Sequence, residues 1–330
     1  MNALAEGSYP GGLGLALQTM SPKGREQFTV CAHRCDLELS RKLFDAMIEN
    51  NHIDPMRPEG CKKCWAIRDI TLRLSGTGEE SDLFFQNKIA PHTPWVRAMQ
   101  MPSVFNTLLA TPEPRPFYED LHRHAVLRAL TEGSADITAE YLAYEAAVAS
   151  GESTDHFDGA HADSWMTSEN GGGWWEYAML KDESGKWNEL LCAKFFPKTC
   201  ALFRGLPMVD SPRPLSSVRC EGWCPEGAEN AFSAGMVSFY RLAPGRSVPM
   251  HNGGTNQRLK CHLVVRAPTT SVLFGGGGAS ITAGGVTKAV STGDTFCFDD
   301  SYLHSVSNEG DIARIVLDVA MWHPGLEWGA

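Results

Sequence analysis

Hydrophobic positions follow two different periods along this chain. In the first half, apolar residues recur three or four positions apart with charged residues between them, which predicts amphipathic helices. We expect helices over residues 37–50, 117–130 and 137–149, with Gly133-Ser134 separating the last two. Residues 65–74 mix apolar and charged side chains in a way that fits either a helix or a strand.

After Gly173 the pattern changes to short β-prone runs separated by turn residues. The strands that we expect cover residues 236–242, 260–266, 270–274, 295–298 and 313–320. Several short strands at this spacing indicate a sandwich or a barrel. Between the two halves, residues 151–173 are polar and Gly-rich, which predicts a surface loop or a domain boundary. The pattern therefore predicts helices followed by a β domain.

Composition limits the classes of partner. The chain has 330 residues, 43% of them hydrophobic, and a formal net charge of −10. That charge argues against a nucleic-acid binder, because phosphate binding needs a concentrated positive field. No apolar run approaches the roughly 18 residues of a membrane-spanning helix, and the N-terminus does not resemble a signal peptide. We therefore expect a cytoplasmic protein whose partner is a small molecule, a peptide or another protein.

Two histidines of the β region stand where strands are expected to begin or end. His251 lies within the segment PMHNGGTN, which comes after the Pro244-Gly245 turn. His304 follows the segment FDDSYL. Imidazole is a common ligand for iron, and strand ends at a barrel mouth can hold two such ligands rigidly. A histidine taken alone is more often structural, so the residues by themselves leave both interpretations open.

Longer segments carry a resemblance to a known family. They are WWEYAML at 174–180, PKTC at 197–200, HNGGTNQRLKCHL at 251–263, FDDSYLHSVSN at 298–308 and RIVLDVAMWHP at 314–324. In this order they resemble the aspartyl/asparaginyl β-hydroxylases, which are iron(II)- and 2-oxoglutarate-dependent oxygenases.

The resemblance implies an α+β fold in which a double-stranded β-helix, a barrel of the jelly-roll or cupin type, follows a helical N-terminal region. We expect an unassigned region at residues 1–84 and an oxygenase domain at 85–330. Within that domain, residues 85–150 form a helical lead-in and residues of about 174–325 form the barrel.

The resemblance also implies the metal ligands. His251 and His304 match the two histidines that hold Fe(II), and we expect them to be catalytic. The usual carboxylate two positions after the first histidine is absent, because Gly253 stands there, as in the family. Water would then fill that position. Asp299 and Asp300 could substitute for the missing carboxylate, although a structural pair at a strand end is the favoured interpretation.

Binding of the cosubstrate 2-oxoglutarate is expected from a second group of matches. Arg314 lies ten residues after His304, at the spacing of the arginine that binds the distal carboxylate. An arginine within an apolar run is costly to bury unless it is paired, which supports this role independently. His262 matches the histidine near the other carboxylate. Lys260 replaces an arginine and Tyr240 replaces a serine, and Lys260 is a point charge where the family has a planar fork.

The implied reaction is hydroxylation of an unactivated C–H bond, by analogy at the β-carbon of Asp or Asn in a peptide or protein. Two alternatives stay open. The same chemistry could act on a small molecule, a free amino acid or a lipid acyl chain, or the barrel could be a catalytically silent binding module. Arg258 and Asn256 are expected to line the site, with a structural role as the alternative for Arg258.

Ten cysteines add two further expectations. Cys31, Cys35, Cys61 and Cys64 form a set of two pairs spaced like the ligands of a structural zinc ion, with unbonded thiols as the alternative. The segment between Cys192 and Cys200 contains PKTC, where similar enzymes of the secretory pathway carry a disulfide. For a cytoplasmic protein we expect free thiols instead.

Overall fold

The computed structural model describes residues 97, 99–100, 102, 105–110, 115–118, 124–151, 174–182, 184–210, 235–251, 253–268 and 278–326. The chain divides into two compact units, one formed by Met1–Ser103 with Arg219–Glu229 and the other by Val104–Val218 with Asn230–Ala330. In the first unit, Arg97 and Gln100 form an isolated β-bridge. The elements described below all belong to the second unit.

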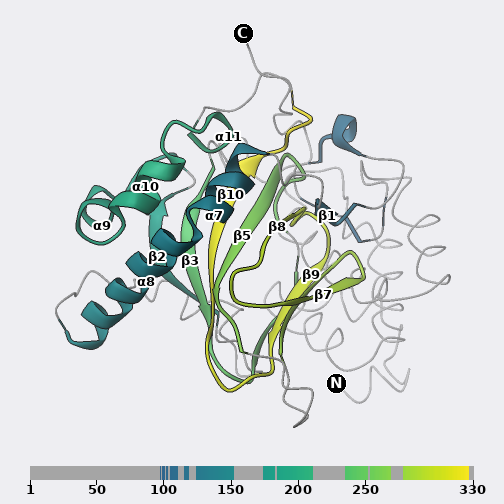
Figure 1. Ribbon diagram of the computed structural model, residues 1–330. Coiled ribbons are helices and arrows are strands. Elements are labelled where there is room, and N and C mark those ends of the chain that lie inside the picture. Colours follow the sequence, from purple (N-terminus) through teal and green to yellow (C-terminus); the bar gives the residue numbers. More distant parts are fainter. Residues whose placement is uncertain are drawn as a thin grey trace, which may run out of the picture. The chain divides into compact units, whose positions relative to one another are not determined.

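Two antiparallel sheets form the centre of this unit (Figure 1). The larger has six strands in the order β1-β8-β5-β10-β3-β2, and the smaller has four in the order β4-β9-β6-β7. The strands are β1 (Phe117–Tyr118), β2 (Trp174–Lys181), β3 (Val237–Leu242), β4 (Arg246–His251), β5 (Arg258–Arg266), β6 (Ala279–Ala283), β7 (Val286–Val290), β8 (Thr295–Phe298), β9 (His304–Asn308) and β10 (Arg314–Trp322).

From β3 to β10 the chain crosses to the other sheet at each connection except the one between β6 and β7. Eight antiparallel strands wound between two facing sheets in this way form a double-stranded β-helix of the jelly-roll type. The fold class predicted from the sequence is therefore confirmed.

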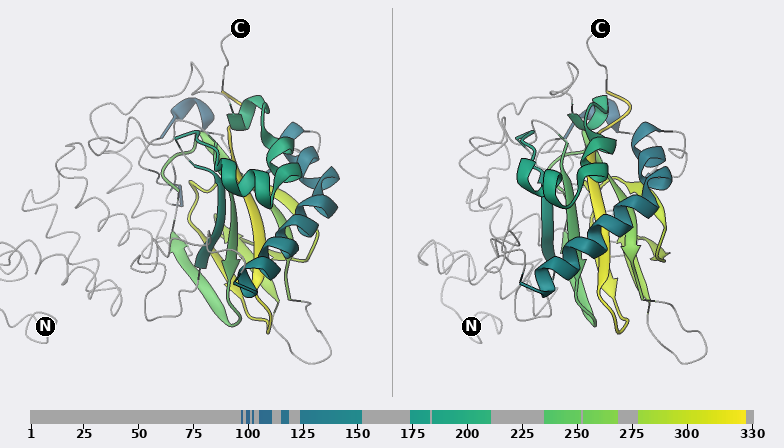
Figure 2. Two further views of the ribbon diagram at one scale, coloured as in Figure 1. Left: turned by 90° about the vertical axis from the view of Figure 1, so that its left-hand side faces the viewer. Right: turned by 60° about the vertical axis from the view of Figure 1, so that its left-hand side comes forward.

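Helices cover one face of the six-stranded sheet (Figure 2). They are α7 (Ala125–Glu132), α8 (Ser134–Ala149), α9 (Glu189–Lys194), α10 (Pro197–Phe203) and α11 (Pro207–Asp210), with a 3-10 turn, η4, at Thr107–Leu109. Gly133 joins α7 to α8, and a β-carbon on it would lie 2.4 Å from Leu202 Cδ1 and 2.7 Å from the Ala129 carbonyl oxygen. Only glycine fits this junction without displacing its neighbours, so the predicted break at Gly133-Ser134 is confirmed.

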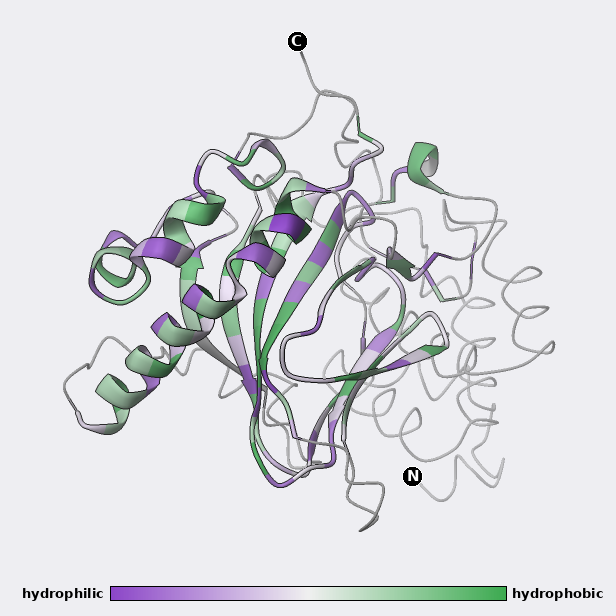
Figure 3. Cartoon of the chain, viewed as in Figure 1, coloured by the Kyte–Doolittle hydropathy of each residue, from purple (hydrophilic) through white to green (hydrophobic). Residues whose placement is uncertain are grey.

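The six-stranded sheet buries side chains on both faces. Successive residues of a strand point to opposite sides, and hydrophilic and hydrophobic residues alternate along much of β5 (Figure 3). We call the helix-covered side the outer face and the space between the two sheets the barrel interior. On β10, Leu317 and Val319 belong to the apolar cluster under the helices, whereas Val316 belongs to the cluster between the sheets. On the outer face, the Phe239 ring lies 4.9 Å from that of Tyr141 and 5.1 Å from that of Phe196.

Most of the predicted elements that fall on described residues are confirmed with shifted ends. The strands expected at 236–242, 260–266, 295–298 and 313–320 correspond to β3, β5, β8 and β10, and the helix expected at 137–149 is α8. The remaining predictions, at 37–50, 65–74 and 270–274, lie outside the described residues, as does the boundary expected at 84/85.

The helix expected at 117–130 is wrong in its first part. Phe117 and Tyr118 form β1, paired with Phe298 and Cys297 of β8, and the helix begins only at Ala125. The Phe117 ring packs against those of Phe296 and Phe298, at 6.3 and 6.4 Å between centroids. Tertiary pairing therefore overrides the helical spacing of this segment.

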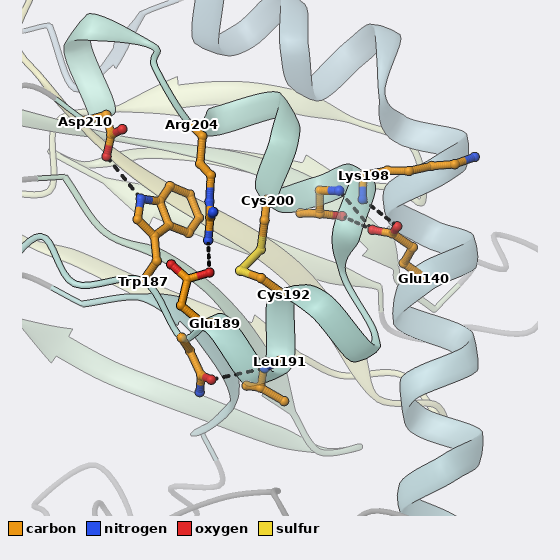
Figure 4. The surroundings of a disulfide bond; sticks show 11 residues. Glu140, Trp187, Glu189, Leu191, Cys192, Lys198, Cys200, Arg204 and Asp210 are labelled. Atoms are coloured by element: carbon orange, nitrogen blue, oxygen red, sulfur yellow. Dashed lines mark hydrogen bonds and ion pairs between the residues drawn. A yellow bond between two sulfur atoms is a disulfide. The ribbon is translucent and has the colours of Figure 1, made fainter.

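A disulfide joins Cys192 of α9 to Cys200 of α10, so the expectation of free thiols is wrong (Figure 4). Next to it, the Glu140 carboxylate of α8 accepts hydrogen bonds from the backbone N–H groups of Lys198 and Thr199 at the start of α10. These contacts hold the three helices together, because the disulfide joins α9 to α10 and Glu140 joins α8 to the first turn of α10.

A second disulfide, between Cys261 and Cys297, joins β5 to β8, whose two cysteines are opposite each other in the strand register. The sequence did not reveal it, because 36 residues separate the two cysteines. Disulfides persist mainly in oxidising compartments, so these bonds argue against the cytoplasmic location, which no other observation tests. Among the described helices, none has the length and apolar character required to cross a membrane. The cysteines of the expected zinc site lie outside the described residues.

Candidate active site

His251 and His304 meet at one end of the barrel interior. His251 is the last residue of β4 and His304 the first of β9, and the two are paired in the four-stranded sheet. Their ring centroids lie 4.1 Å apart. The register shifts between Val248 and His251, and such an irregularity turns a side chain away from the regular alternation of the strand. Both histidines therefore lie at strand ends, on two strands that the sequence pattern did not predict.

The environment of His304 keeps its imidazole neutral. Its Nδ1 lies 2.9 Å from the carbonyl oxygen of Tyr302, and a proton on Nδ1 donated there leaves the Nε2 lone pair exposed to a ligand. Burial, followed by the charge of His251, lowers the pKa of His304 well below its ordinary value, against the weaker raising effect of the Tyr302 carbonyl. A neutral imidazole with an oriented Nε2 is the form that binds a metal ion.

This pair therefore fits a divalent metal of the first transition series. Within the described parts of the chain, no group of three or more His, Cys, Asp or Glu side chains gathers as a metal site. Two protein ligands would leave the remaining coordination positions to small molecules.

Gly253 lies against Asp300 at the place where a third protein ligand is usual. A β-carbon at Gly253 would come 2.4 Å from the Asp300 carboxyl carbon, and the Gly253 N–H donates to the Asp300 carbonyl oxygen at 2.5 Å. A carboxylate side chain at position 253 would therefore collide with that of Asp300. Asp299 has a structural contact, since its Oδ1 accepts hydrogen bonds from the N–H and the hydroxyl of Ser301.

Four further ionisable side chains lie on the interior faces of β5 and β10. Lys260 and His262 come from β5, and Arg314 and Asp318 from β10. Lys260 Nζ lies 2.7 Å from Asp318 Oδ2, and His262 Nε2 lies 3.9 Å from Asp318 Oδ1. Tyr240 of β3 lies beside them, with its ring centroid 5.7 Å from Lys260 Nζ.

The charge states of these groups follow from burial and from each other. Burial lowers the pKa of Arg314 to about 10, against the raising effect of Asp318, so its guanidinium stays charged at neutral pH. Burial, then Arg314 and Lys260, lowers the pKa of His262 well below its ordinary value. Burial also acts to lower the pKa of Lys260, but Asp318, Tyr240 and Asp300 together raise it above its ordinary value. At neutral pH Lys260 and Arg314 are therefore cations, and His262 is a neutral imidazole.

Three more of the expected site residues are described by a hydrogen bond, a register position or a near sulfur atom. Asn256 exchanges two hydrogen bonds with the backbone of Asn106, from Asn106 N to Oδ1 at 2.7 Å and from Nδ2 to the Asn106 carbonyl oxygen at 2.9 Å, so it anchors the segment before η4. Arg258 is buried at the start of β5, opposite Trp322 in the register. The Tyr240 hydroxyl lies 3.9 Å from Met236 Sδ.

Asp318 is the site residue that the sequence did not reveal. It is 1% exposed and stands inside an apolar run, four residues after Arg314 and so on the same face of β10. A carboxylate in such a run was the available signal, of the same kind that supported the role of Arg314.

Comparison with known proteins agrees with the resemblance found in the sequence. Residues 224–324 match the family model described as Aspartyl/Asparaginyl beta-hydroxylase. The chain is 31% identical over 160 residues to the Aspartate beta-hydroxylase domain-containing protein 2 of Homo sapiens, covering 46% of this chain and 37% of that protein. It is 28% identical over 155 residues to the Aspartyl/asparaginyl beta-hydroxylase of Homo sapiens, covering 47% of this chain and 16% of that protein. The similarity to this hydroxylase family is thereby confirmed for the barrel region, and the chain spans little more than a third of these relatives at most.

Among solved structures, the chain is similar to a predicted oxalate decarboxylase from Thermotoga maritima, at 18% identity and a TM-score of 0.22, over 27% of this chain and 66% of that one. It is also similar to the Schizosaccharomyces pombe Cnp3 cupin domain, at 11% identity and a TM-score of 0.22, over 27% of this chain and 56% of that one. Scores this low carry no weight of their own, so the fold assignment rests on the strand order.

Proposed function

We propose that this chain is an iron(II)- and 2-oxoglutarate-dependent hydroxylase acting on the β-carbon of an Asp or Asn residue in a peptide or protein. The observation that carries the proposal is the joint placement of the His251–His304 pair and the buried Arg314 in one barrel interior. A barrel that only needed stability would gain little from a buried cation, because burying a charge is costly. The match to a hydroxylase family supports the same conclusion.

Each of these residues has a distinct part in binding. His251 and His304 would hold the iron, and the Tyr302 carbonyl keeps His304 oriented for it. Arg314 would bind the distal carboxylate of 2-oxoglutarate, since a guanidinium forms two parallel hydrogen bonds to a carboxylate. His262, neutral and buried, would lie near the other end of the cosubstrate. Bound iron with its cosubstrate supplies the oxidising chemistry that hydroxylates a C–H bond, and the apolar walls of the barrel exclude water from it.

The choice of Asp or Asn as substrate rests on the descriptions of the family and its relatives. A small molecule, a free amino acid or a lipid acyl chain would use the same site residues. Incubation with iron(II), 2-oxoglutarate and each class of substrate, followed by mass spectrometry, distinguishes them. A product heavier by one oxygen atom, with stoichiometric succinate, is expected for an Asp- or Asn-containing peptide.

The first test is an anaerobic titration with iron(II) and 2-oxoglutarate, followed by the visible charge-transfer band of their chelate. The band should form with the parent protein and be absent from His304→Ala, which lacks a metal ligand. For Arg314→Ala we expect about 100-fold weaker cosubstrate binding with metal binding retained, since a buried charged hydrogen-bonding partner is lost.

A matched control is His124→Asn, because His124 caps α7 through its Nδ1 and asparagine is also a good N-cap. This variant should give the same band as the parent. Absence of the band from a well-folded parent protein would refute the oxygenase proposal. The binding-module alternative, which the engagement of Lys260 by Asp318 favours, would then take its place.

A further inference from the structure

Asp318 is a buried carboxylate that none of the roles above uses. Its Cα pairs with His262 on β5 and with Ser238 on β3, so it lies at the middle of the six-stranded sheet. On the interior face of β10 its neighbours are Val316 and Ala320. A carboxylate among such residues is strongly destabilising unless it is paired, which makes its one strong partner informative.

That partner is Lys260, and the two side chains differ in their exposure. The Lys260 side chain is 23% exposed, whereas that of Asp318 is 2% exposed, so Lys260 is the member of the pair that solvent reaches. Lys260 Nζ donates a hydrogen bond to Asp318 Oδ2 at 2.7 Å. Among the described residues, Asp318 Oδ1 and His262 Nδ1 have no hydrogen-bond partner. The resting interior therefore contains an ion pair at the position where an anionic cosubstrate is expected.

The charges of the interior groups decide what this pair does. Lys260 and Arg314 each contribute one positive charge, Asp318 contributes one negative charge, and His262 is neutral. The net charge of these four groups is +1, which matches one carboxylate. A ligand carboxylate that binds the Lys260 ammonium comes close to the Asp318 carboxylate, which already binds it. The two negative charges then repel each other.

We propose that Asp318 is a positioning residue that sets the affinity of this site for 2-oxoglutarate by holding Lys260 in an ion pair. This inference rests on the proposed function. Asp318 withdraws Lys260 from the cosubstrate and leaves the net positive charge of the interior with Arg314. Cosubstrate binding then depends on Arg314 and on the metal, and Lys260 contributes only when Asp318 is removed.

The test is calorimetric titration of 2-oxoglutarate into protein loaded with Mn(II) under argon, so that no turnover is needed. Asp318→Asn keeps the shape of the side chain and removes its charge. It should bind 2-oxoglutarate about tenfold more tightly, because Lys260 becomes available. Its unliganded melting temperature should fall, and 2-oxoglutarate should raise that temperature more than it does for the parent, since the ligand restores a partner to Lys260.

A second variant, Lys260→Met with Asp318→Leu, replaces the whole pair with apolar residues of similar size, a change that buried ion pairs often tolerate. It should bind 2-oxoglutarate within about threefold of the parent, because the pair contributes nothing net to binding. This variant decides the question if Asp318→Asn does not fold.

Weaker binding by Asp318→Asn, or tenfold weaker binding by the double variant, would overturn the inference, because Lys260 would then be a cosubstrate ligand that Asp318 supports. If the parent does not bind 2-oxoglutarate and Asp318→Asn does, the proposed function fails for the parent while the role of Asp318 stands. If neither binds it, both fail.

Discussion

The two faces of the six-stranded sheet differ although the same strands build them. On β5, Cys261 and Leu263 lie in the outer-face core under the helices, whereas Lys260 and His262 point into the barrel interior. The outer face is apolar and cross-linked by Cys261–Cys297, and the interior face holds buried charges. Because a strand alternates its side chains, one short segment serves stability on one side and binding on the other.

This difference predicts different responses to substitution. A close-packed apolar face loses stability when a side chain is truncated, because the cavity is only partly filled by relaxation. A face with buried charges is not optimised for stability, and perturbed ionisable groups of this kind are typical of functional sites. The two faces should therefore be separable by mutation.

The largest expected effect is on the outer face, at Phe239. Phe239→Ala should lower the free energy of unfolding by about 4 kcal/mol, because the ring is fully buried against Tyr141 and Phe196. Urea unfolding measures this loss, and the affinity of the folded variant for 2-oxoglutarate should stay within about threefold of the parent.

Its neighbour Ser238 is a matched control that points into the interior. Ser238→Ala removes the hydrogen bond to the Ala178 carbonyl oxygen at 3.1 Å and should lower the free energy of unfolding by only about 1 kcal/mol. Loss of cosubstrate binding by folded Phe239→Ala would show that the two faces are not independent.

A somewhat smaller loss of stability is expected when the pH is lowered and His323 is protonated. The His323 ring contacts Tyr118 of the outer-face core. The Tyr118 hydroxyl lies 2.8 Å from His323 Nε2. Burial, followed by the charge of Arg115, lowers the pKa of His323 to about 4 from an ordinary value of 6.5. Between these two values the unfolded chain binds a proton that the folded chain does not, so stability falls as the pH falls from 6.5 towards 4.

The loss attributable to His323 is roughly 3 kcal/mol when the pH has reached its folded-state pKa. His262 and His304 also have lowered pKa values and act in the same direction. The measurement is therefore a comparison of the parent with His323→Gln by urea unfolding at pH 7 and pH 4.5. The variant should lose less stability than the parent on acidification. An identical loss in both proteins would assign the pH dependence to other groups.

The same alternation explains what the sequence could and could not predict. β8 and β10 were predictable because most of their residues are apolar, as in strands that are buried on both faces. β4 and β9 were missed, since RSVPMH contains a proline and HSVSN alternates polar residues with apolar ones over only five positions. The two histidines that end β4 and begin β9 were singled out through their turn-rich settings and the family resemblance, not through these two strands.

The interior charges were predictable only in part. The resemblance supplied Arg314, His262 and Lys260, and for Arg314 its position in an apolar run gave independent support. Asp318 was missed although it stands in the same run, because its significance depends on a partner from another strand. The pairing of Cys261 with Cys297 was missed for the same reason. Register between distant strands is a property of the folded sheet, and local patterns do not report it.

The smallest expected effect concerns Tyr240, which sharpens the comparison inside the barrel itself. The family resemblance implies that its hydroxyl stands in for a serine near the distal carboxylate of the cosubstrate. In the structure this hydroxyl lies 3.9 Å from Met236 Sδ, four residues earlier in the chain, while the ring lies beside Lys260.

Tyr240→Phe keeps the ring, so it should change the free energy of unfolding by less than about 0.5 kcal/mol and the affinity for 2-oxoglutarate by less than about threefold. Calorimetric titration with Mn(II)-loaded protein measures the affinity, with Arg314→Ala as the reference for a lost ligand. A tenfold weaker affinity would instead make the hydroxyl a cosubstrate ligand, and would mean that the ring turns towards Arg314 when the cosubstrate binds.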